Sequence, residues 1–283
     1  MNSIDHKPIF SVVIATFNAE KYLSRCLSSV TSQTFSRYEI VVIDGGSSDA
    51  TVEIISSYKE KISYWISEPD GGIYAAWNKA LLHTQGEWVC FLGADDYFCD
   101  MNVLENLNIS ILGVSEEMKV VYGNLLIVDE SEKTLKNVGR PWPMAKQRFF
   151  EVMTIPHPGM MHHRSLFSEV GNFDETFKIA GDYDLLLRYL CSHDAIYIPS
   201  VNVACMTYGG ISTSSNNVRL KYKEVIKARE KIGLRKKTMF MRFYWSRATV
   251  RAILEELLGR KVTNTLADAC RLLVGRKRVW TRT

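Results

Sequence analysis

Trp88-Val-Cys-Phe-Leu-Gly-Ala-Asp-Asp96 is the segment around which this chain is organised. Its first five residues are apolar and lie between glycines, which is typical of a short buried strand. Two adjacent carboxylates, Asp95 and Asp96, follow the point where the strand ends. Burying an ionised carboxylate is costly without a compensating partner, and a divalent cation with oxygen ligands is one such partner. The alternative is that one of the two caps a following helix.

Similar apolar runs alternate with helical patterns through the first hundred residues. The sequence predicts strands at 10–17, 39–44, 64–67 and 88–92, and helices at 22–30, 52–58 and 73–81, the first of them capped by Asn18. Strands that alternate with helices indicate βαβ units, a mostly parallel sheet and an α/β fold. The carboxyl ends of parallel strands gather at one edge of the sheet, where ligands bind.

Polar side chains stand at three of these strand ends: Thr16 and Asn18, then Asp44, then the pair Asp95 and Asp96. We expect them to converge on a ligand. Neither a P-loop nor a complete dinucleotide-binding glycine motif is present. A bound diphosphate would therefore need a metal, which the Asp pair can hold.

Four segments resemble, in order, the motifs of the family 2 glycosyltransferases. They are Phe10-Ser-Val-Val-Ile-Ala-Thr-Phe-Asn18, Val41-Val-Ile-Asp-Gly-Gly-Ser-Ser-Asp-Ala-Thr51, Asp70-Gly-Gly-Ile-Tyr-Ala-Ala-Trp-Asn-Lys79 and Phe91-Leu-Gly-Ala-Asp-Asp96. The resemblance implies a GT-A fold with a Rossmann-like central sheet, a nucleotide-sugar donor, Mn²⁺ or Mg²⁺ as cofactor, and inversion at the anomeric carbon.

The same resemblance implies site residues, carried over by position. The donor-binding set is Thr16, Phe17, Asn18, Asp44, Asp70, Asn78, Lys79 and Asp95, and the metal ligands are Asp95 and Asp96. The chain departs from the family's pattern at two positions. Gly93 stands where many members have the first Asp of the DxD motif, and Ala75 stands where relatives often have Asp.

The acceptor side is expected in residues 101–217, where strands are predicted at 120–122 and 125–128, joined by Gly123-Asn124. Asp182 opens a predicted helix, so it is either an N-cap, worth about 1 kcal/mol, or a general base that takes the acceptor's proton. Its position matches the family's usual base. Asp184 is the weaker candidate.

Two further residues are assigned to the acceptor. His157 lies in a Pro-His-Pro-Gly run that resembles a family segment beside the acceptor, and Arg188 can pair with a carboxylate or with phosphate. The three histidines at 157, 162 and 163 lack a fourth ligand pattern, so a zinc site is disfavoured and a structural role is expected for at least one. The Gly- and Ser-rich segment 208–217 predicts a loop, and a similar segment in relatives closes over the donor.

We expect a GT-A catalytic domain at 1–217, with its nucleotide-sugar half at about 8–100, and a basic helical extension at 218–283. Residues 235–283 carry 13 Lys and Arg against 3 Asp and Glu, whereas residues 1–234 carry 22 against 28. The basic aromatic helix pattern after Met239 fits an anionic membrane surface or packing on the catalytic domain.

Six scattered cysteines without a CxxC pair favour a reducing compartment, and neither a signal peptide nor a membrane span is indicated. Together these features predict a peripheral enzyme on the cytoplasmic face of the inner membrane. Its expected reaction is transfer of a hexose or N-acetylhexosamine from a UDP-sugar to a lipid-linked saccharide in O-antigen, lipopolysaccharide or exopolysaccharide assembly.

The two rival functions are a sugar-phosphate nucleotidyltransferase and a nucleic-acid-binding protein. A sugar-phosphate nucleotidyltransferase would carry a glycine-rich loop with Lys or Arg after the first strand, which is absent here. A nucleic-acid-binding protein would use the basic tail, but the acidic main domain argues against nucleic acid as a partner.

Overall fold

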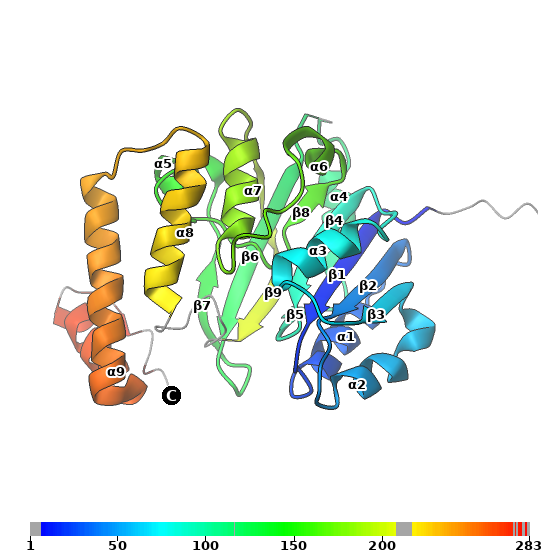
Figure 1. Cartoon of the computed structure of the whole chain (residues 1–283), viewed down its shortest axis with the longest axis horizontal. Coiled ribbons are helices and arrows are strands. Elements are labelled where there is room, and N and C mark those ends of the chain that lie inside the picture. Colours follow the sequence, from blue (N-terminus) through cyan, green and yellow to red (C-terminus); the bar gives the residue numbers. More distant parts are fainter. Residues whose placement is uncertain are drawn as a thin grey trace, which may run out of the picture.

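One mixed sheet of nine strands forms the middle of the part of the chain that the structure describes (Figure 1). The computed structural model describes residues 7–115, 117–207, 217–273, 275, 277, 278 and 281. The strand order is β3-β2-β1-β4-β8-β6-β9-β5, and β7 pairs with β6. The strands are β1 Phe10–Thr16, β2 Tyr38–Asp44, β3 Tyr64–Ser67, β4 Trp88–Gly93, β5 Asp96–Phe98, β6 Val120–Val128, β7 Thr134–Val138, β8 Met161–His163 and β9 Ile196–Thr207.

Strand β1 is the centre of the parallel half of the sheet. It pairs in parallel with β2 on one side and with β4 on the other, and β2 pairs in parallel with β3. The register places Thr16 opposite Asp44 and Ala15 opposite Gly93. The polar ends of these strands therefore meet at one edge of the sheet, and the predicted α/β fold is confirmed.

Helices cover both faces of the sheet. Val13, Val41 and Phe91 belong to an apolar core shared with α3 and α5 to α9, whereas Val12 and Val42 belong to a second core shared with α1, α2 and α4. This follows from the two-residue repeat of a strand, which sends successive side chains to opposite faces. The helices are α1 Leu23–Thr31, α2 Thr51–Ser57, the 3₁₀ turn η1 Lys59–Lys61, α3 Ile73–Leu81, α4 Val103–Ile111, α5 Trp142–Phe149, α6 Ser165–Val170, α7 Gly181–Leu190, α8 Val218–Lys231 and α9 Met239–Leu273.

Helix α8 is tied to the segment that leads into α7. The buried carboxylate of Glu224 accepts hydrogen bonds from the backbone N–H groups of residues 178, 179 and 180, at 2.8, 2.8 and 2.9 Å. Farther along α8, the buried Arg229 donates to the backbone carbonyls of Phe150 and Lys236. Helix α8 therefore belongs to the same packed unit as α7.

Helix α9 begins on that unit and then leaves it. Met241 and Trp245 are buried in the core beside α7 and α8. The helix is broken at Gly259, where φ is 77°. Arg251, before the break, donates to the Asn264 side chain after it at 2.6 Å, so the two parts lie side by side at the edge of the molecule (Figure 1).

Two local expectations are wrong, and a third falls mostly on residues that the structure does not describe. The predicted cap at Asn18 is wrong, because its backbone is left-handed (φ 47°), its side chain bonds to Ser48, and the helix starts at Leu23. The predicted break at Gly123-Asn124 is also wrong, since β6 is one strand with a register shift there. Most of the predicted loop at 208–217 lies outside the described residues.

No helix in the described part of the chain combines the length and the apolar character needed to cross a bilayer.

Replacing Glu224 with Ala should lower the free energy of unfolding by about 3 kcal/mol, because three backbone N–H groups lose a charged acceptor in a buried position. Urea denaturation monitored by circular dichroism measures the change. Glu230→Ala, at an exposed position of the same helix, is the matched control and should stay within about 0.5 kcal/mol of the parent. Equal losses in the two variants would contradict the anchoring role.

Candidate active site

The ends of β1 and β2 form a tightly bonded polar edge. The fully buried Asp44 carboxylate accepts hydrogen bonds from the backbone N–H and hydroxyl of Ser47, and from the Ser67 hydroxyl at 2.6 Å. The Thr16 hydroxyl is buried and has no hydrogen-bond partner among the described residues. The Asp70 carboxylate lies against the loop that follows Asp44, where a Cβ on Gly45 would come within 3.2 Å of Oδ2. These predicted donor-binding residues are thus brought together.

The loop after β1 is fastened to the loop after β2. The Asn18 side chain accepts from the Ser48 N–H at 2.9 Å, and the Asn18 N–H donates to the Ser47 hydroxyl at 2.8 Å. Phe17, between these contacts and β1, is 63% exposed. An aromatic ring held at the mouth of the sheet edge offers a flat apolar surface to a planar ligand.

The side chains of the two carboxylates after β4 both lie close to Gly93. A Cβ at this position would lie 2.8 Å from Asp95 Oδ1 and 3.1 Å from Asp96 Oδ2, so the missing side chain leaves room for both groups. Asp95 is partly exposed, whereas Asp96 is buried and its Oδ1 has no hydrogen-bond partner in the described structure. Burial raises the pKa of Asp96 well above its ordinary value, and the neighbouring Asp95 charge adds to this. Neither residue caps a helix, because β5 follows directly.

Arg25 of α1 is a site residue that the motifs did not reveal. One guanidinium nitrogen donates to the backbone carbonyl of Asp95 at 3.1 Å and to the Thr207 hydroxyl at 2.9 Å. The guanidinium also lies over the Tyr97 ring, 4.3 Å from its centroid. It therefore holds the backbone that carries the Asp pair. A single Arg on an amphipathic helix gives no sequence signal for such a contact.

Asn78 and Lys79 make contacts within the protein. The Asn78 amide donates to the Phe173 carbonyl and accepts from the Phe173 N–H at 3.0 Å, so it fastens α3 to the segment before α7. Lys79 forms an ion pair with Glu68 at 2.5 Å. Asn78 therefore supports the segment before α7, and Lys79 holds Glu68, the residue after β3. The contact of both residues with a donor stays a prediction.

Asp182 lies in the first turn of α7 beside α3. Its carboxylate accepts from the Tyr183 N–H at 2.8 Å and from the Tyr74 hydroxyl at 3.4 Å. Gly181 permits this approach, because a Cβ there would lie 2.8 Å from the Tyr74 ring. Burial raises the pKa of Asp182, against the opposing effects of the Tyr183 N–H, the Lys221 ammonium and the Tyr74 hydroxyl. The N-cap position itself belongs to Ala180.

Asp182 also lines a pocket between α7, α8, α9 and the segment that follows α5. A carboxylate at the wall of a pocket, with a raised pKa, is suited to take a proton from a bound hydroxyl group. Of the predicted acceptor-side residues, only Asp182 has this placement.

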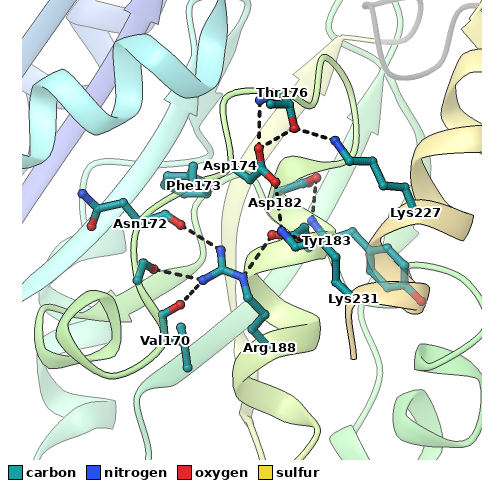
Figure 2. A network of polar contacts seen from close by, with 12 residues as sticks. Val170, Asn172, Phe173, Asp174, Thr176, Asp182, Tyr183, Arg188, Lys227 and Lys231 are labelled. Carbon is teal, nitrogen blue, oxygen red and sulfur yellow. Dashed lines mark hydrogen bonds and ion pairs between the residues drawn. The ribbon is translucent and has the colours of Figure 1, made fainter. Parts of the chain in front are cut away.

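Arg188 makes its contacts within the protein (Figure 2). Its guanidinium pairs with the buried Asp184 carboxylate at 3.0 Å and donates to the backbone carbonyls of Val170, Gly171 and Asn172. Asp184 is paired on its other side with Lys231 of α8, at 2.7 Å. Arg188 is expected from the sequence to pair with a carboxylate or with phosphate, and in the structure it pairs with a carboxylate. The Arg188 guanidinium also holds the backbone of the loop before α7.

His157 is part of the core. Its side chain is 6% exposed and stacks on the Trp77 ring, with centroids 5.1 Å apart. Burial lowers its pKa to about 3, so the ring is neutral near pH 7. His162 is also buried and lies 5.1 Å from it, ring centroid to ring centroid. The structural role expected for at least one histidine is confirmed, and the predicted acceptor contact of His157 has no geometric support.

Comparisons with known proteins agree with this fold. Residues 11–169 match the sequence profile of the family described as Glycosyl transferase family 2, and the chain therefore belongs to this family and is a glycosyltransferase. It is 27% identical over 216 residues to the PGL/p-HBAD biosynthesis glycosyltransferase of Mycobacterium bovis, an alignment that covers 75% of this chain and 80% of that one.

Two solved structures share the fold. The mannosyltransferase PcManGT from Pyrobaculum calidifontis, in complex with GDP-Man and Mn²⁺, has a TM-score of 0.62 and 16% identity, covering 96% of this chain and 81% of its own. Residues 1–349 of S. aureus TarS, in complex with UDP-GlcNAc, have a TM-score of 0.59 and 20% identity, covering 91% and 83%. The chain spans 39% of a longer TarS chain. The GT-A fold is thus confirmed.

The buried His157 predicts a pH dependence of stability. Its pKa is about 3 in the folded protein, below the ordinary value of 6.5, so its contribution is fully present above about pH 6.5. As the pH falls from there towards 3, the unfolded chain takes up a proton that the folded chain does not. The free energy of unfolding should then fall by up to about 1.4 kcal/mol per pH unit from this group. Urea denaturation from about pH 7 to 4 should show a shallower slope for His157→Phe, and equal slopes would contradict the assignment.

Proposed function

We propose that this glycosyltransferase is a metal-dependent inverting enzyme that moves a hexose or N-acetylhexosamine from a UDP-sugar to a lipid-linked saccharide. The observation that carries the proposal is the placement of Asp182. Asp182 has a raised pKa and lines a pocket. Its carboxylate accepts a hydrogen bond from Tyr74 of α3, the helix that begins three residues after the predicted donor-binding residue Asp70. A nucleotide-sugar donor is supported by the ligands of the two related structures, UDP-GlcNAc and GDP-Man.

The residues around Gly93 fit a divalent cation. Asp95 presents a partly exposed carboxylate, and Asp96 has a buried oxygen without a partner in the described part of the chain. No cluster of three or more His, Cys, Asp or Glu side chains suited to a metal occurs among the described residues. Mg²⁺-type sites commonly use one or two carboxylates and take their remaining ligands from substrate phosphates and water. Mn²⁺ or Mg²⁺ held by Asp95 and Asp96 would neutralise the charge of a leaving diphosphate.

Asp182 accepts the proton of the acceptor hydroxyl as that oxygen attacks the anomeric carbon. The new carbon–oxygen bond forms while the bond from the anomeric carbon to the diphosphate oxygen breaks, and the electron pair leaves with the diphosphate. A single displacement of this kind inverts the anomeric centre. Thr16, Phe17, Asn18, Asp44 and Asp70 hold the nucleotide at the ends of β1 to β3.

The proposed acceptor is a saccharide carried on a lipid diphosphate, in assembly of a bacterial surface polysaccharide such as O-antigen or exopolysaccharide. The support is the exposed side of α9. Phe243, Val250 and Leu257 are 63%, 56% and 73% exposed at seven-residue spacing, with Arg242 and Arg247 near them. A helix that exposes apolar and basic residues together is suited to an anionic membrane surface. The enzyme then works as a peripheral protein on the cytoplasmic face of the inner membrane, with no nucleic-acid partner.

Sugar transfer should require the Asp182 carboxylate, the Asp95 carboxylate and a divalent metal. The assay gives the purified protein a panel of nucleotide sugars with Mn²⁺ or Mg²⁺, and farnesyl-diphosphate-linked N-acetylglucosamine as acceptor. Asp182→Asn should lower kcat by about 10²-fold or more while donor affinity persists, and Asp95→Asn should weaken donor binding in the presence of metal. Asp100→Asn, at an exposed position after β5, is the control and should keep full activity. Turnover that survives Asp182→Asn would exclude this residue as the base.

Binding of α9 to a membrane can be tested by flotation with vesicles. The parent should float with vesicles that contain about one third anionic lipid and stay behind with neutral ones, since basic residues near the surface supply much of the attraction. Phe243→Ser combined with Leu257→Ser should reduce the floated fraction several-fold. Leu82→Ser, which removes an apolar side chain 78% exposed at the end of α3, is the control. If the double variant floats as well as the parent, α9 is not the membrane contact. If the double variant also differs from the parent in oligomeric state, the exposed side of α9 instead binds a second copy of this chain.

A further inference from the structure

The pocket beside Asp182 is lined by three helices and by Val152 and Met153, which follow α5. Asp182 comes from α7, Lys221 and Val225 come from α8, and Tyr244 and Trp245 come from the beginning of α9. Two of the three helices therefore belong to the segment after residue 217, beyond the family motifs. The pocket combines one carboxylate, one ammonium group, aromatic rings and aliphatic side chains, which is the composition of a site for a small polar ligand with an apolar face.

The position of Lys221 is set by the anchor of α8. Lys221 lies three residues before Glu224 and four before Val225, so these three side chains share one face of the helix. Glu224 holds the backbone of residues 178–180, directly ahead of Asp182. The same face of α8 thus holds the chain that leads to Asp182 and brings the Lys221 ammonium to the pocket that Asp182 lines.

The start of α9 supplies an aromatic wall. The Tyr244 and Trp245 rings lie 5.2 Å apart, centroid to centroid, and Trp245 is also 5.2 Å from the Tyr222 ring of α8. Trp245 is 7% exposed, and its indole N–H has no acceptor among the described residues. A buried donor without an acceptor is costly, so a ligand oxygen at this wall would relieve it. Aromatic rings beside hydrogen-bonding groups suit the face of a pyranose ring.

We propose that this pocket is the acceptor subsite, in which the Tyr244–Trp245 wall receives the acceptor's sugar ring and Lys221 is the positioning residue that keeps the Asp182 carboxylate ionised. The inference rests on the proposed function, in which Asp182 is the base. It goes beyond that function by making the C-terminal segment part of the substrate site.

The groups that face Asp182 agree with this role for Lys221. Tyr74 of α3 donates a long hydrogen bond, the Tyr183 N–H of α7 donates a short one, and Tyr244 of α9 shares the pocket. Lys221 is the positively charged group among the described residues that line the pocket. Burial raises the pKa of Asp182 and lowers that of Lys221, and each charge opposes the shift of the other. A base that must be ionised before it can accept a proton gains from such a partner.

The first test measures the ionisation of Asp182 without any substrate. Carbon-13 NMR of protein labelled at the Asp side-chain carboxyl, with Asp182→Asn to assign the signal, follows the titration of this group. Lys221→Met should raise the pKa of Asp182 by about one unit, because an opposite charge nearby favours the ionised form. Lys221→Arg should restore the parent value, and Lys223→Met, exposed on the same helix, should leave it unchanged. An unchanged pKa in a folded Lys221→Met protein would overturn the role of Lys221.

The second test measures acceptor binding by tryptophan fluorescence, with farnesyl-diphosphate-linked N-acetylglucosamine as the probe. Tyr244→Ala should weaken binding about tenfold, and Trp245→Phe should weaken it by removing the indole N–H, while donor affinity stays the same. Equal affinity in parent and variants, or no binding by the parent, would overturn the subsite. Binding and titration as expected, without sugar transfer from any donor, would instead refute the proposed function and leave the subsite in place.

Discussion

The parallel pairing of β1 with both β2 and β4 fixes where the other elements of the fold can lie. Parallel strands need crossover helices, so each strand must end at the same edge and each helix must return over a face of the sheet. The consequence is that Thr16, Asp44 and Gly93 end neighbouring strands. Carboxylates that would be costly to bury singly then share one edge, where the proposed cation and nucleotide diphosphate would compensate them.

The second requirement is a rigid connection between this edge and Asp182. Helix α3 provides it, because Asn78 binds the backbone of Phe173 and Tyr74 lies against Gly181 and Asp182. Helix α8 holds the chain before Asp182 from the other side, because the Glu224 carboxylate accepts from the N–H groups of residues 178–180. The candidate base is thus held by donor-side and C-terminal elements together. A catalytic group held by rigid helices keeps its geometry without reorganisation when the substrate binds.

The elements that depend on local pattern could be predicted from the sequence. The strands at 64–67 and 88–93 and the helix at 73–81 appear within a residue of their predicted bounds, because apolar periodicity and glycine boundaries are local signals. The partners of long polar side chains could not be predicted. Lys231 pairs with Asp184, and Lys79 pairs with Glu68, for reasons that only the packed fold reveals. For Glu224 the sequence does hold one signal, because a charged residue beside the apolar residues of its helix indicates a buried polar contact.

In the proposed function, Asp182 and the edge formed by the ends of β1, β2 and β4 belong to one active site. A crystal structure with UDP and Mn²⁺, collected at a wavelength where manganese scatters anomalously, tests whether they do. We expect an anomalous peak bonded to the Asp95 carboxylate and the diphosphate, the base and ribose beside Thr16 and Asp44, and Asp182 facing the open end of the diphosphate. Manganese bound away from Asp95, or a nucleotide bound away from the ends of β1, β2 and β4, would contradict this expectation.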